Sequence, residues 1–135
     1  MHEWSYGHHP VMTDGAAARV ARLMRRALDE LPSQYAGQLD NVQFQLRRAP
    51  SSRDRRRLGL GNSMLYGLYE GVPLTQRGSG YDRVLPDRIT LYWGALLRSF
   101  PEDEELAMEV RNTLYHEIAH YFGMDEDELH DTSVR

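Results

Sequence analysis

Residues 116–126 read HEIAHYFGMDE, and this segment constrains the chain more than any other feature. Residues four apart in an α-helix lie on one face, so the imidazoles of His116 and His120 can reach one metal ion. Glu117 projects beside them, where it can act on a metal-bound water as a general base without being a ligand. A surface helix that carries these residues by chance is the alternative, and the residues that follow make it the weaker one.

The third metal ligand is expected from the few residues that follow this helix. A catalytic zinc site has three protein ligands and an open position for water. Gly123 should end the helix in the left-handed conformation, and the turn there brings the next residues back toward the metal. Glu126 is the expected third ligand, and Asp125 and His130 are the alternatives.

Composition narrows the kinds of site and partner. The 135 residues fit one domain, in which residues 1–12 are expected to form a flexible arm. The chain has no cysteine, so a transition-metal site must use histidine and carboxylate ligands. The excess of acidic over basic residues, 20 against 16, argues against a nucleic-acid binder. No apolar run is long enough to span a membrane and no secretory signal is visible, so we expect a cytoplasmic protein.

Hydrophobic periodicity predicts two long helices and several strands. The helices are expected over residues 14–31 and from about 101 to 123. The strands are expected over residues 42–47, 64–72 and 88–93. Gly67 and Gly71, in the second of these strands, indicate a bulge or a close backbone approach.

The second long helix should carry a core face and a metal face side by side. Its core stripe, at helical spacing, consists of Leu106, Val110, Leu114, Ile118 and Phe122. His116 and His120 fall just outside this stripe. The hydrophobic core therefore leaves the two histidines available to a metal.

Two long loops are expected, over residues 50–62 and 73–86, together with a short turn at residues 96–97. The first loop contains the run RDRRR at residues 53–57. An anionic partner could bind this run. A solvated loop is the favoured interpretation, because no aromatic residue interleaves the arginines.

The predicted metal face suits peptide hydrolysis. Glu117 would take a proton from the metal-activated water and pass it to the leaving amine. Tyr121, Tyr92 and Tyr69 are candidate donors to the polarised carbonyl. An extended peptide could pair with an exposed edge of the strand at residues 88–93, because that mode of binding needs only backbone groups.

Three segments carry a resemblance to a known family. They read GLYEGVPLT at residues 67–75, VLPDRITLY at residues 84–92, and HEIAHYFGMDE at residues 116–126. In these segments the chain resembles the small zincin-like metallopeptidases, a minimal zincin family. The resemblance implies an α+β fold, with a small mixed sheet of three to four strands packed against an N-terminal helix and the HExxH helix. It also implies zinc as the cofactor, His116 and His120 as ligands, and Glu117 as the general base.

The chain departs from the family pattern in two ways that bear on function. Glu126 stands where the family usually has Asp, and we expect neither the Met-containing turn of metzincins nor a domain that would form the lower wall of a substrate cleft. We expect a zinc-dependent metallopeptidase that acts on peptides or unfolded proteins. The alternative is a zinc-binding peptide- or protein-interaction module with weak or no proteolysis. Neither a nucleic acid nor a membrane is an expected partner, and the oligomeric state is left open.

Overall fold

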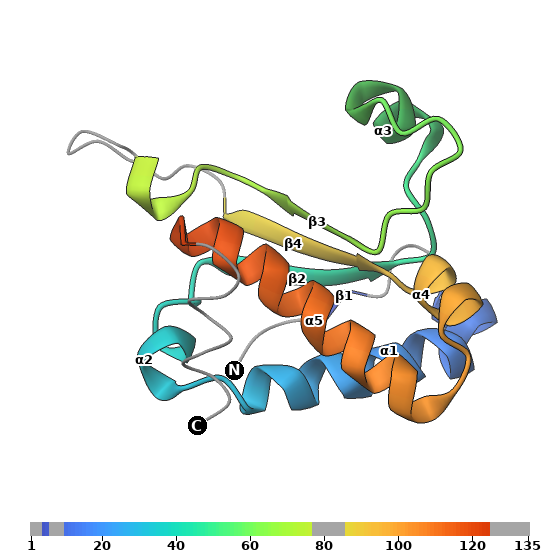
Figure 1. Ribbon diagram of the computed structural model, residues 1–135, viewed down its shortest axis with the longest axis horizontal. Helices are drawn as coiled ribbons and strands as arrows, with labels where there is room; N and C mark the ends of the chain where they lie inside the picture. Colours follow the sequence, from blue (N-terminus) through green and yellow to red (C-terminus); the bar gives the residue numbers. More distant parts are fainter. Residues whose placement is uncertain (1–3, 6–9, 77–85, 125–135) are drawn as a thin grey trace.

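A computed structural model describes residues 4–5, 10–76 and 86–124 of the chain. The fold is α+β, as the resemblance implies. The strands are β1 (Trp4–Ser5), β2 (Val42–Arg47), β3 (Gly67–Glu70) and β4 (Asp87–Tyr92). The helices are α1 (Pro10–Asp29), α2 (Ser33–Ala36), α3 (Ser52–Leu58), the 3-10 helix η1 (Leu74–Gln76), α4 (Trp93–Ser99) and α5 (Asp103–Phe122). Figure 1 shows α1 and α5 on one side of the sheet and α3 on the other.

The sheet is mixed and has the strand order β1-β2-β4-β3. β1, β2 and β4 are parallel, whereas β3 runs antiparallel to β4 and forms an edge. Side chains alternate across a strand, and Phe44, Leu46, Ile89 and Leu91 are fully buried. Together with the apolar faces of α1 and α5 they form the hydrophobic core.

The predicted core stripe of the second long helix is confirmed at four of its five residues, and the fifth, Phe122, is partly buried and packs against the core. On α5 the residues Leu106, Val110, Leu114 and Ile118 are fully buried. The hydroxyl of Tyr115 donates a hydrogen bond to the backbone carbonyl of Ala27, at 2.8 Å, and so ties α5 to α1. α5 is therefore fixed to both the sheet and the first helix.

The predicted loop at residues 50–62 is wrong in part, because it contains α3. The Ser51 hydroxyl accepts a hydrogen bond from the backbone N–H of Asp54, at 3.0 Å, and Gly59 ends the helix with a φ of 65°. Both are standard helix-end devices. The prediction from composition missed this helix, because α3 is short and buries none of its residues.

Other boundaries also differ from the predictions. Inside the predicted arm, Trp4–Ser5 pair with β2 and α1 begins at Pro10. Such a short strand is held by backbone pairing, which hydrophobic periodicity does not report. α4 replaces the predicted turn at residues 96–97 and buries Trp93 and Leu96. β3 ends earlier than predicted, before Gly71, whose φ of 151° departs from strand geometry.

Candidate metal centre

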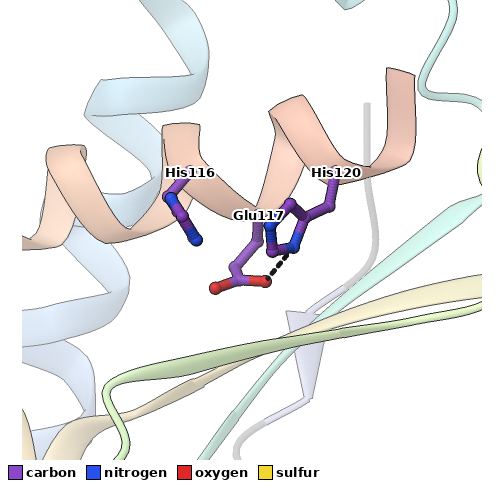
Figure 2. A group of neighbouring side chains, drawn as sticks. All are labelled: His116, Glu117 and His120. Atoms are coloured by element: carbon purple, nitrogen blue, oxygen red, sulfur yellow. Dashed lines mark ion pairs between the residues drawn. The ribbon is translucent and has the colours of Figure 1, made fainter. Parts of the chain in front are cut away.

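The last two turns of α5 bring His116, Glu117 and His120 together. One potential ligand atom from each residue lies within 4.8 Å of the others. The two imidazole rings have centroids 4.5 Å apart and planes inclined at 64°. Figure 2 shows all three side chains on the side of α5 that faces the neighbouring strand. The HExxH spacing therefore produces the convergence that the sequence predicted.

The three side chains differ in exposure. Glu117 is 7% exposed, whereas the His120 side chain is 52% exposed and His116 is half-buried. His120 Nδ1 lies 3.3 Å from Glu117 Oε1. The histidines are thus accessible to an ion and a substrate, while the carboxylate sits below them in a region with little water.

This environment changes the acidity of Glu117. Burial raises the pKa of the Glu117 carboxyl above its ordinary value of 4.5. The nearby His120 and His116, and a hydrogen bond from the backbone N–H of Tyr69, act in the opposite direction. Because desolvation is the largest effect, the carboxylate is a stronger base than a glutamate in water.

Tyr69 connects the site to the sheet edge. The backbone N–H of Tyr92 donates to the carbonyl of Tyr66, at 2.9 Å, which makes these two residues a hydrogen-bonded antiparallel pair. Hydrogen-bonded pairs alternate along such a ladder, so the N–H of Tyr69 points away from β4 and toward Glu117. The predicted peptide-pairing edge at residues 88–93 is wrong, because β4 lies between β2 and β3. β3 is the edge strand beside the site.

Close backbone contacts hold β3 and η1 against α5. A Cβ atom added to Gly67 would lie 2.6 Å from Cγ2 of Thr113, one turn before Glu117 on α5. At the end of α5, Gly123 has a φ of 72°, as the sequence predicted, and packs against Thr75 of η1. Because Gly67 and Gly123 have no side chain, β3 can lie close to α5 and η1 can lie close to the end of α5.

The remaining candidate ligands lie outside the described residues. Glu126, and its alternatives Asp125 and His130, come after Met124, where the described part of the chain ends. The structure therefore brings together His116 and His120 with Glu117. The identity of the third ligand stays a prediction.

The three tyrosines proposed as oxyanion donors have other roles. The Tyr121 hydroxyl donates to the backbone carbonyl of Gln38, at 3.2 Å. The Tyr69 hydroxyl donates to Asp87 Oδ2, at 2.9 Å, and Tyr92 lies on the opposite face of the sheet. Asp87, which holds the Tyr69 side chain beside the site, was not among the residues predicted from the sequence. It is only 2% exposed and lies against Gly71, one of the two glycines that indicated a close approach.

Two imidazoles and a carboxylate on one helix, packed against a small mixed sheet, are the arrangement of a zincin-type metal site. The chain belongs to the zincin-like metallopeptidases, because the profile of that family matches residues 39–134. The match extends over β2, β3, β4 and the HExxH helix, and it confirms the resemblance inferred from the motifs. No curated protein matched the chain. Among the helices in the described ranges, none combines the length and the hydropathy of a membrane span.

Proposed function

We propose that the chain is a zinc-dependent peptidase in which Glu117 is the general base. The observation that carries the proposal is the convergence of His116, Glu117 and His120 within 4.8 Å, beside an edge strand. Neutral imidazole and carboxylate groups are ligands that suit zinc, and the chain has no thiolate to compete with them. His116 and His120 would hold the ion, with Glu126 as the proposed third ligand.

The protein groups have distinct roles in this proposal. Zinc, when bound, lowers the pKa of water to near neutrality and polarises a carbonyl group. The Glu117 carboxylate accepts a proton from the attacking water and delivers it to the amine nitrogen of the leaving peptide. Its burial favours this role, because a desolvated carboxylate holds a proton more readily.

The substrate in this proposal is an extended peptide. β3 is an edge strand, and an added peptide can pair with such an edge through its backbone groups. The outward N–H of Tyr69 already donates to Glu117. A substrate carbonyl would take over this hydrogen bond, and Glu117 would then be released toward the water. Backbone pairing favours substrates without fixed structure, namely short or unfolded peptides.

Metal analysis and a peptide-library assay test the proposal. The zinc-loaded chain should cleave library peptides, and Glu117→Gln should retain zinc while cleavage falls by at least about 100-fold. Glu105→Gln is the matched control, because Glu105 is exposed in the first turn of the same helix, and it should cleave normally. Bound zinc with no cleavage would contradict the proposal and indicate a zinc-binding interaction module. Cleavage that persists in Glu117→Gln would exclude Glu117 as the base.

A further inference from the structure

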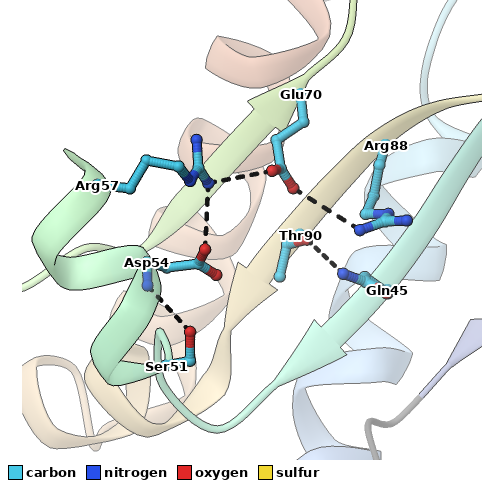
Figure 3. Close-up of polar contacts among 7 residues, drawn as sticks. All are labelled: Gln45, Ser51, Asp54, Arg57, Glu70, Arg88 and Thr90. Carbon is cyan, nitrogen blue, oxygen red and sulfur yellow. Dashed lines mark hydrogen bonds and ion pairs between the residues drawn. The ribbon is translucent and has the colours of Figure 1, made fainter.

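A polar hollow lies on the face of the sheet opposite the metal centre. It has a volume of about 610 Å³ and lies between α3 and strands β2, β4 and β3. This volume is within the range of about 300–1,000 Å³ that is typical of small-molecule sites. Figure 3 shows polar side chains from α3 and from the strands directed toward one another across this space. The metal centre does not account for this hollow.

The hollow exists because α3 does not pack on the sheet through apolar side chains. None of its residues is buried. Arg55 instead anchors the helix to the following loop, since its Nη1 donates to the backbone carbonyls of Gly61 and Ser63, at 3.0 Å each. The space between α3 and the sheet is thus left unfilled by the protein itself.

Four arginines surround this space. Arg53 and Arg57 are one turn apart on α3, so they lie on the same face of the helix and both line the hollow. Arg47 of β2 and Arg88 of β4 line it from the opposite wall. Arg53 makes no hydrogen bond or ion pair with any residue in the described part of the chain. Arg53 and Arg57 are exposed, as predicted for this run of arginines, but both also line the hollow.

Two carboxylates share the same space but do not balance the four cations. Arg57 Nη2 lies 3.2 Å from Asp54 Oδ1 and 3.3 Å from Glu70 Oε2. Arg88 Nη1 is 4.0 Å from Glu70 Oε1. The lining thus has an excess of two positive charges, four guanidinium groups against two carboxylates, in a chain whose net charge is −4.

The floor of the hollow is polar and ordered. Gln45 Nε2 donates to Thr90 Oγ1, at 2.8 Å, and both residues are buried. Tyr92 lies beside them, and burial, followed by the charges of Asp54 and Glu70, raises the pKa of Tyr92 to about 12. The phenol therefore keeps its proton and can donate a hydrogen bond to a ligand.

We propose that this hollow binds a small phosphate monoester. A phosphate dianion matches the excess of two positive charges, and its tetrahedral oxygens accept hydrogen bonds from guanidinium groups on both walls. A single carboxylate carries one negative charge and would balance only half of this excess. The carboxylates of Asp54 and Glu70 accept hydrogen bonds from hydroxyl groups on the organic part of the ligand.

Calorimetric titration of the full zinc-loaded chain tests the site, with inorganic phosphate and ribose 5-phosphate as the probes. Both should bind saturably, and ribose 5-phosphate should bind more tightly because the hollow also holds its sugar. Arg53→Gln should weaken binding of each probe at least about tenfold, since it removes a charge-assisted hydrogen bond. Arg56→Gln is the matched control, because Arg56 is an exposed neighbour on α3 that does not line the hollow. It should change the affinity less than about twofold.

Several outcomes would overturn the proposal. Equal losses of affinity in Arg53→Gln and Arg56→Gln would show that the probes bind by general charge attraction and not in the hollow. Binding that persists in Arg53→Gln and disappears in His120→Ala would place the phosphate at the metal. Tighter binding of succinate than of ribose 5-phosphate would favour a dicarboxylate ligand. Binding of single-stranded RNA without competition from ribose 5-phosphate would indicate a surface for a macromolecule instead.

The melting temperature of Arg53→Gln should equal that of the wild type, which would show that its weaker binding is not caused by a loss of fold.

Discussion

The contact between Gly67 and Thr113 predicts that Gly67→Ala destabilises the protein. A Cβ at position 67 would lie 2.6 Å from Thr113 Cγ2, 3.1 Å from Leu91 Cδ2 and 3.3 Å from the carbonyl oxygen of Thr90. Carbon atoms in contact prefer about 3.5–4.0 Å, so α5 must move away from β3. Overpacking of this kind costs about 1–3 kcal/mol. The reduced freedom of the unfolded chain offsets about 0.4–1 kcal/mol of this cost. We expect a net loss of about 1–2 kcal/mol.

Urea unfolding of four proteins measures this contact as a double-mutant cycle: the wild type, Gly67→Ala, Thr113→Ser and the double variant. Thr113→Ser removes the clashing methyl but keeps the hydroxyl that donates to Glu109 Oε2, at 3.1 Å. The double variant should therefore recover at least about 1 kcal/mol relative to additive behaviour.

Gly15→Ala is the matched control for the glycine substitution. Gly15 lies in α1, and a Cβ there would have no atom within 4 Å. This variant should be more stable than the wild type by about 0.5–1 kcal/mol. A fully stable Gly67→Ala protein would refute the argument, as would additive free energies of unfolding in the cycle.

Two further predictions concern groups around the site. Tyr69→Phe removes the hydroxyl that donates to the buried Asp87 carboxylate, and urea unfolding should show a loss of about 1.5–3 kcal/mol. Tyr66→Phe, which removes a neutral hydrogen bond to Ser99, should cost only about 0.5–1.5 kcal/mol, and equal losses would contradict the assignment. In the metal-free protein the pKa of Glu117 is higher in the folded state than in the unfolded chain, so protonation of this carboxyl stabilises the fold. This contribution to the free energy of unfolding is fully present below pH 4.5 and is lost as the pH rises through the folded-state pKa. Unfolding curves of Glu117→Gln should therefore match the wild type near pH 4 and show a more stable protein at pH 8, and a pH-independent difference would exclude this coupling.

The sequence could predict the elements whose signals are local. The apolar stripe of α5 and the HExxH spacing both repeat at the helical period, so one pattern located the core face and the metal face together. The strand at residues 42–47 alternates at period two and was predicted with the observed bounds. Gly67 and Gly71 indicated a close backbone approach, and they lie against Thr113 and Asp87.

Features that depend on distant contacts could not be predicted in the same way. β4 has the clearest strand pattern, but its place between β2 and β3 depends on pairing between segments far apart in the chain. The edge beside the metal centre was therefore assigned to the wrong strand. α3 was missed because it buries no residue and so has no hydrophobic period. The partner of the Tyr69 hydroxyl, Asp87, could be found only once the antiparallel pairing of β3 with β4 was known.

The register of β3 determines both sides of the sheet at once. Successive side chains of a strand point to opposite faces, so Tyr69 faces α5 while Glu70 faces the hollow. A shift of one residue would carry the Glu70 carboxylate into the core and turn the N–H of Tyr69 away from Glu117. The Gly67 contact with α5 and the Tyr69–Asp87 hydrogen bond both oppose such a shift. The residues that fix this edge strand therefore position Glu117, the proposed general base, on one face and the arginine-lined hollow on the other.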